Sequence, residues 1–145
     1  MGQLNDYAYR EDPAKAEDSR WVGRPEYPAA RYAERTDPAT DAGKIFAGLT
    51  HLIDVRRRTP EFAGGRLIPF HTHNPHVLGY QRPGTADGGE STILVLANFG
   101  DTAQHLDAET LGGMPDTAED LIDGGRVALR DGLTLKPHGL RWLRV

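Results

Sequence analysis

The stretch Ser91–Phe99, STILVLANF, decides the fold of this chain. Its centre, Ile-Leu-Val-Leu, is apolar without interruption, which is typical of a strand that is buried on both faces. Shorter segments with strand-like patterns flank it, among them HVLGYQR (76–82) and LRWLRV (140–145). Clusters of glycine, proline, asparagine and aspartate separate these segments, as turns require. The pattern therefore predicts a mainly β chain, with an antiparallel β-sandwich over residues 61–145.

One amphipathic helix is predicted before the sandwich, over residues 38–59. Asp37 is a favourable N-cap, and Pro38 suits the first helical position. An apolar stripe with a basic end follows at helical spacing and consists of Ile45, Phe46, Leu49, Leu52, Ile53 and Arg56. Pro60 ends the helix, because the residue before a proline disfavours the helical conformation. The stripe needs a partner surface, so we expect it to dock on the sandwich or to self-associate.

The first 36 residues have a different character from the rest. They are rich in tyrosine, arginine, aspartate and proline, and they show little apolar periodicity. Only EYPAARYAER (26–35) has room for a short helix. This part contains too few apolar residues to form a core of its own, so we expect it to be mobile unless another surface covers it.

Composition excludes several classes of function. The 145 residues carry a net charge of −4 with acidic and basic residues interspersed, so no basic stripe for nucleic acid is present. The run Arg56–Arg58 complements the dipole at a helix end instead. The chain has no cysteine, which excludes disulfides and thiolate chemistry. No apolar run approaches the ~18 residues of a membrane span, and we expect no membrane partner and a cytoplasmic location.

Three histidines within six residues, in HTHNPH (71–76), raise the question of a metal site. His71 and His73 would share one face of a strand, but Asn74-Pro75 is a turn signal that interrupts it before His76. We therefore expect exposed turn histidines and no metal. The two serines, Ser19 and Ser91, lie in no nucleophile elbow, and the paired glycines open no phosphate loop. We expect no cofactor.

A second candidate surface lies in the first 36 residues. Five acidic residues between positions 6 and 18 precede Arg20, Trp21 and Arg24, and several tyrosines lie in the same part of the chain. Aromatic rings stack on sugar rings, and charged groups bind sugar hydroxyls, so this composition is typical of a carbohydrate site. An ordinary polar loop has the same composition, and both interpretations stay open at this point.

Six segments, in order along the chain, resemble the amylosucrase-like branch of the α-amylase superfamily, glycoside hydrolase family 13. They are NDYAYREDPAKAEDSRWVGRPEY (5–27), RYAERTDPATDAGKIFAGLTHLIDVRRRTPEFAGG (31–65), NPHVLGYQR (74–82), LVLANF (94–99), DLIDGG (120–125) and LTLKPHGLRWL (133–143). The collinear set covers almost the whole chain.

This resemblance implies a (β/α)8 barrel followed by a C-terminal β-sandwich. Residues 1–60 would be the loop after barrel strand eight and the last barrel helix, and residues 61–145 would be the sandwich. The partner of the predicted helix would then be the barrel. The whole enzyme would catalyse retaining glucosyl transfer from sucrose or a related α-glucoside, without a cofactor.

The catalytic carboxylates of the family lie on earlier barrel strands, so the resemblance places no catalytic residue in this chain. We expect a truncated product that is inactive alone and meets glucan or sucrose only with the missing barrel. Arg20 is the expected substrate-binding residue, near the glucosyl ring and paired with an acid of another loop; it also suits a loop-anchoring salt bridge. At the position of Gly23, many relatives carry histidine or asparagine, so this chain lacks a side chain there. The alternative function is a stand-alone carbohydrate-binding or interaction module.

Overall fold

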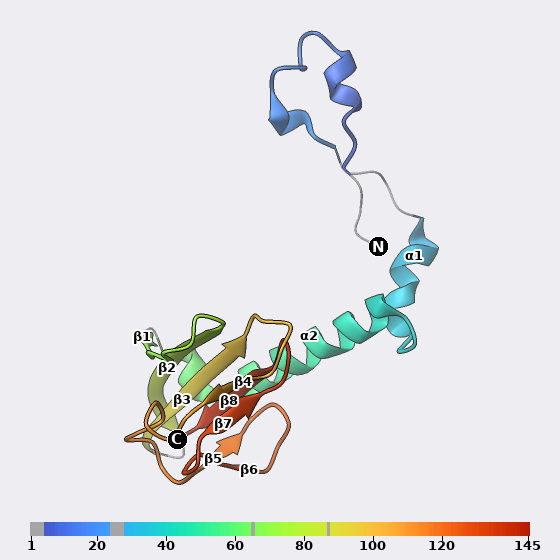
Figure 1. Ribbon diagram of the computed structural model, residues 1–145. Coiled ribbons are helices and arrows are strands. Elements are labelled where there is room, and N and C mark those ends of the chain that lie inside the picture. Colours follow the sequence, from blue (N-terminus) through green and yellow to red (C-terminus); the bar gives the residue numbers. More distant parts are fainter. Residues whose placement is uncertain (1–4, 24–27, 65, 87) are drawn as a thin grey trace. The chain divides into compact units, whose positions relative to one another are not determined.

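A computed structural model describes residues 5–23, 28–64, 66–86 and 88–145 (Figure 1). The chain divides into two compact units, Met1–Ala47 and Gly48–Val145. Each unit is described by itself. Whether the predicted parts, 1–60 and 61–145, correspond to domains of a longer protein stays a prediction.

The first unit consists of short elements without a core. They are η1 (Ala8–Glu11), η2 (Ser19–Trp21), α1 (Ala29–Ala33) and η3 (Glu34–Thr36), followed by the first turns of α2. None of the described residues between 5 and 42 is buried. The short helix predicted within 26–35 is α1, although residues 26 and 27 lie outside the described part of the chain. Local hydrogen bonds, and not apolar packing, hold these elements.

The long helix α2 spans Asp41–Arg58, so it begins three residues later than predicted. Its N-cap is Thr40, whose Oγ1 accepts a hydrogen bond from the Gly43 N–H at 3.0 Å. Asp37 instead shapes the preceding turn, because its carboxylate accepts the Ala39 N–H at 2.9 Å. The turn and the helix approach closely here: a Cβ at Gly43 would overlap the Asp37 carbonyl oxygen.

The second unit is built on a six-stranded antiparallel sheet in the order β1-β2-β3-β8-β5-β6, with a separate two-stranded sheet, β4-β7 (Figure 1). The strands are β1 (Ile68–Pro69), β2 (Val77–Ala86), β3 (Gly89–Asn98), β4 (Gln104–Leu106), β5 (Thr117–Asp120), β6 (Arg126–Ala128), β7 (Leu133–Leu135) and β8 (Leu140–Arg144). The short helix η4 (Pro60–Ala63) connects α2 to this sheet region.

Strand β3 carries the core, as the apolar run predicts. Leu94 and Leu96 point into the larger cluster, to which β4 and β7 contribute Leu106, Leu133 and Leu135. Ile93 and Val95 point to the opposite face and join Phe62, with Tyr80 and Trp142 packed against them. All four residues of the run are at most 3% exposed. The mainly antiparallel β fold with one main helix is therefore confirmed.

Two details of the sheet differ from the sequence expectation. The hairpin between β2 and β3 is tighter, because Pro83–Ala86 belongs to β2 and Ala86 is paired with Gly89. Strand β5, TAED, was not predicted, because it buries Ala118 and the charged Asp120 on its inner face. A strand with a buried acid has no apolar alternation to detect. In the described residues, no helix has both the length and the apolar character needed to cross a membrane.

Candidate functional site

A closed loop in the first unit holds the residues that the sequence singles out for sugar binding. Asp6 and Gly23 form an isolated antiparallel bridge, with Asp6 N–H donating to Gly23 O at 2.6 Å and Gly23 N–H donating to Asp6 O at 3.0 Å. The Asp6 carboxylate also accepts the Ala8 N–H at 2.9 Å. The bridge brings the two ends of the loop together, so the residues between them form one compact segment.

Arg20 lies in this loop with its side chain 89% exposed. Its Nε donates to Asp18 Oδ1 at 2.9 Å and its Nη2 donates to Asp18 Oδ2 at 2.7 Å, which is a bidentate pair. The same carboxylate accepts the Arg20 backbone N–H at 3.0 Å and so caps η2. Hydrogen bonds from the Arg20 side chain and then its backbone lower the pKa of Asp18, and the carboxylate in turn raises the pKa of Arg20.

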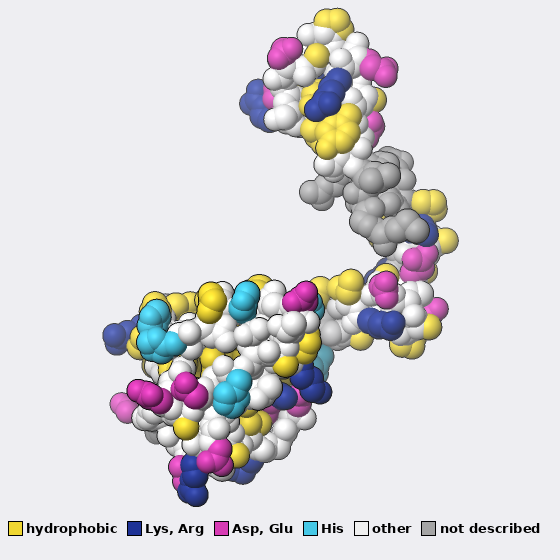
Figure 2. Space-filling model, viewed as in Figure 1, with side chains coloured by type: hydrophobic (Ala, Val, Ile, Leu, Met, Phe, Trp, Pro, Cys, Tyr) yellow, Lys and Arg dark blue, Asp and Glu magenta, His cyan; other side chains and the backbone are white. Residues whose placement is uncertain are grey.

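Two aromatic side chains of the same loop are half exposed, Tyr7 at 48% and Trp21 at 54%. The Arg10 guanidinium lies 4.9 Å from the centre of the Tyr7 ring, and Lys15 Nζ lies 5.1 Å from the centre of the Trp21 ring. Hydrophobic, basic and acidic side chains are intermingled on the face of this unit that Figure 2 shows. The loop thus places exposed aromatic rings and charged side chains next to one another.

The structure brings Arg20 and Trp21 together in one loop, but it pairs Arg20 with an acid two residues away. Part of the predicted surface, Arg24, lies outside the described residues. The sequence analysis counted Asp18 only as one of the acidic residues of this region. Its position two residues before Arg20, at the start of a helical turn, could have predicted both a helix cap and a local ion pair with Arg20. The role of Arg20 toward a sugar stays a prediction.

The histidine stretch lies between β1 and β2, as predicted for a connection. His71 and His73 are exposed, with ring centres 4.6 Å apart in an edge-to-face arrangement. The turn is set by Asn74, whose side-chain oxygen accepts the His76 N–H at 3.0 Å. Among the described residues, no group of three or more histidine or acidic side chains is arranged to hold a metal ion.

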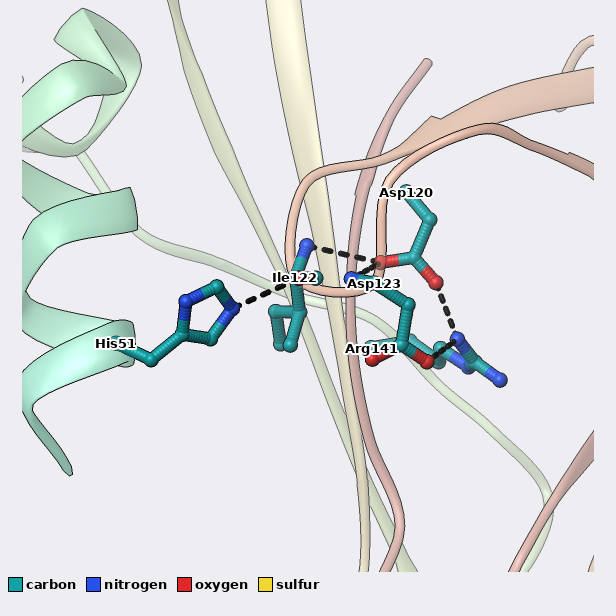
Figure 3. A network of polar contacts seen from close by, with 5 residues as sticks. All are labelled: His51, Asp120, Ile122, Asp123 and Arg141. Carbon is teal, nitrogen blue, oxygen red and sulfur yellow. Dashed lines mark hydrogen bonds and ion pairs between the residues drawn. The ribbon is translucent and has the colours of Figure 1, made fainter. Parts of the chain in front are cut away.

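The motif DLIDGG, one of the family-like segments, forms a polar corner of the second unit (Figure 3). Asp120 is 1% exposed, and its carboxylate accepts the Ile122 N–H at 3.0 Å and an N–H of Arg141. Asp123 accepts from the same guanidinium at 2.5 Å. His51 of α2 is hydrogen-bonded through Nε2 to the Ile122 carbonyl at 2.8 Å. The motif therefore has a structural part in joining α2 to the β5–β6 turn.

A second buried acid, Glu61, connects η4 to the sheet. Its carboxylate is fully buried and accepts from Arg144 Nε at 2.7 Å and from Ser91 Oγ at 2.6 Å. Arg144 also donates to Glu119 at 2.8 Å. Burial by itself would raise the pKa of Glu61, but the hydrogen bonds from Arg144 and Ser91 outweigh it, and the pKa lies below its ordinary value.

No protein-family model matches the chain. Solved structures of trehalulose synthase MutB do match. One MutB variant, from crystals soaked with trehalulose, is 27% identical with a TM-score of 0.58, covering 81% of this chain and 20% of that chain. MutB from Pseudomonas mesoacidophila MX-45 is 25% identical with a TM-score of 0.56, covering 92% of this chain and 24% of that chain.

An isomaltulose synthase variant from Erwinia rhapontici NX5, in complex with glucose, covers 84% of this chain and 20% of that chain at 18% identity and a TM-score of 0.50, so it shows the fold alone. Our chain spans about a fifth to a quarter of the length of these proteins. The matches support the resemblance to glycoside hydrolase family 13. They are to trehalulose and isomaltulose synthases, and an amylosucrase-like character stays a prediction.

Proposed function

We propose that this chain is the C-terminal part of a sucrose-active glucosyltransferase or glycoside hydrolase of the α-amylase superfamily. The match to trehalulose synthase MutB over 81–92% of the chain carries this proposal. One of the matching MutB structures was solved in complex with its substrate sucrose. Amylosucrase-like glucosyl transfer, as the six collinear segments imply, is the specific activity that we propose for the whole enzyme.

In such an enzyme the reaction needs a carboxylate nucleophile and a carboxylic acid on either side of the glycosidic bond. We place both outside this chain, which then has no catalytic activity alone. Its contribution is the loop around Arg20. Asp18 binds one edge of that guanidinium group and so holds it in place. We infer that its other N–H groups, on Nη1 and the outer side of Nη2, donate to a sugar hydroxyl or to a second carboxylate in the whole enzyme.

Sucrose turnover by the purified chain, alone and co-expressed with a barrel polypeptide encoded upstream, tests the proposal. We expect turnover only in the combination, and we expect Arg20→Ala to abolish most of it while Arg130→Ala, at a surface ion pair with Asp116, leaves it unchanged. Turnover by the chain alone would contradict the proposed absence of catalysis. Equal activity of the two variants would contradict the role of Arg20.

A second candidate function is a stand-alone carbohydrate-binding module, and the half-exposed Tyr7 and Trp21 favour it. This function requires a change in Trp21 fluorescence when maltooligosaccharide is added to the chain alone. Trp142 packs against Phe62, with ring centres 4.8 Å apart, so its emission should not respond. A response that Trp21→Phe removes would favour the binding module over the enzyme fragment.

A further inference from the structure

Strand β8 is bound in the second unit by segments that are distant from it in the sequence. It pairs with β3 on one side and with β5 on the other (Figure 1). Leu143 is fully buried in the larger apolar cluster. Arg141 binds the buried carboxylate of Asp120, and Arg144 binds that of Glu61. All of these contacts would be the same if β8 came from a second copy of the chain.

A short connection, residues 136–139, joins β7 to β8. It forms a tight turn, in which the Gly139 N–H donates to the Lys136 carbonyl oxygen at 2.9 Å. A Cβ at Gly139 would lie 2.8 Å from the same oxygen, so the turn leaves no room for a side chain there. The conformation of this connection therefore decides whether β8 pairs within its own molecule or within another.

The turn is strained at one residue and held by hydrogen bonds at others. His138 has a φ of 53°, in the left-handed region that is unfavourable for a residue with a Cβ. Asn98 holds the turn closed, because its Nδ2 donates to the Lys136 carbonyl at 2.8 Å and its backbone N–H donates to the Gly139 carbonyl at 2.8 Å. An extended connection would lose these bonds and relieve the strain. Short connections under strain favour the exchange of the element that they carry.

We propose that the second unit exchanges β8 with a second copy of the chain, so that each β8 lies between β3 and β5 of the partner subunit. The surfaces that meet in this dimer are the ones already buried around β8 in the single molecule. The exchange therefore depends neither on the proposed enzymatic function nor on what covers the outside of the second unit. We expect the closed turn to prevail in dilute solution and the exchanged dimer to increase with protein concentration.

Introduced cysteines test the exchange, because the chain has no cysteine of its own. Ala97 of β3 is paired with Leu140 of β8 on one side and with Leu78 of β2 on the other. Ala97→Cys and Leu140→Cys chains are refolded together at high concentration and oxidised mildly, and mass spectrometry identifies the linked peptides. We expect a disulfide between the two chains. The matched control, Ala97→Cys with Leu78→Cys, should give little of it, because β2 and β3 stay in one molecule.

The double variant with both Ala97→Cys and Leu140→Cys shows that the two positions can be linked. In dilute solution we expect its disulfide to form within one chain. A disulfide in the double variant, together with no link between the chains of the mixture, would overturn the proposal. Equal linking in the mixture that contains Leu78→Cys would overturn it as well, because whole molecules would then be in contact without exchanging a strand.

Two substitutions in the connection should change the exchange in opposite directions. His138→Gly removes the cost of the left-handed backbone, so we expect it to lower the fraction of dimer several-fold. Gly139→Ala places a Cβ against the Lys136 carbonyl oxygen, so we expect it to raise that fraction several-fold. Sedimentation of the two variants and the parent chain at one concentration measures the fractions. Equal fractions in both variants, or the opposite order, would contradict the exchange of β8.

Discussion

Two buried carboxylates decide the polar interior of the second unit. Glu61 and Asp120 are 0% and 1% exposed, and each is bound by an arginine of β8, Arg144 and Arg141 respectively. A buried charge without such a partner would cost several kcal/mol. Neither pair was predictable from the sequence. The partners lie 83 residues apart for Glu61 and Arg144 and 21 residues apart for Asp120 and Arg141, and no local pattern links them.

We predict that Glu61→Gln lowers the free energy of unfolding by about 2 kcal/mol, because it leaves Arg144 without its buried counter-charge. The expected loss is below that of a fully buried pair, since Arg144 keeps Glu119 and is partly exposed. Urea unfolding followed by tryptophan fluorescence measures it. Asp116→Asn, which breaks the exposed pair with Arg130, is the control and should leave stability nearly unchanged.

The same variant should change the response to acid. Because the folded pKa of Glu61 lies below its ordinary value of 4.5, its contribution is fully present above pH 4.5 and is lost as the pH falls through the folded pKa. The stability difference between the parent chain and Glu61→Gln should therefore shrink below pH 4.5. A difference that stays constant down to strongly acidic pH would show that Glu61 acts through packing and not through its charge.

At the scale of elements, strong patterns were predictable and polar ones were not. The uninterrupted apolar run predicted a strand and the apolar stripe predicted a helix, and both elements, β3 and α2, are present. The start of α2 was wrong by three residues, because Asp37-Pro38 has the composition of a cap while Thr40 makes the capping hydrogen bond. Strand β5 escaped prediction, because its inner face carries Asp120.

We predict opposite effects for two glycine substitutions in α2. Gly43→Ala should destabilise the first turn of the helix by more than about 1 kcal/mol, because the new Cβ meets the Asp37 carbonyl. Gly48→Ala should stabilise the helix by up to about 1 kcal/mol, since no atom lies within 4 Å of the added Cβ. Hydrogen exchange of the amides within α2 compares the stability of the helix in the two variants. If protection changed in the same way in both, the close approach of Gly43 to the Asp37 carbonyl would be ruled out.

At the scale of the whole molecule, the two units differ in what holds them. The described residues between 5 and 42 bury no side chain, whereas the second unit has two apolar clusters around β3. The candidate site lies in the unit without a core. Arg20 and Trp21 were singled out from composition and resemblance, and a sugar contact of these residues stays a prediction.

We predict that amide hydrogens of residues 5–23 exchange rapidly in the full chain, apart from those of the Asp6–Gly23 bridge, while those of β3 and β8 are strongly protected. Hydrogen exchange read by mass spectrometry on proteolytic fragments measures this. Strong protection throughout the loop in a monomer would show that it packs against a surface, and our description of the first unit would then be wrong.

The position of β8 has a consequence for the time at which this protein becomes folded. β8 follows the other described strands in the sequence, yet it pairs with β3 on one side and β5 on the other. Before β8 has been synthesised, the described strands can pair only as two separate groups, β1-β2-β3 and β5-β6, and Glu61 lacks its partner Arg144. The edge of β3 that β8 covers is then open to strands of other molecules, so we expect the addition of β8 to be the step that protects the sheet from misassembly.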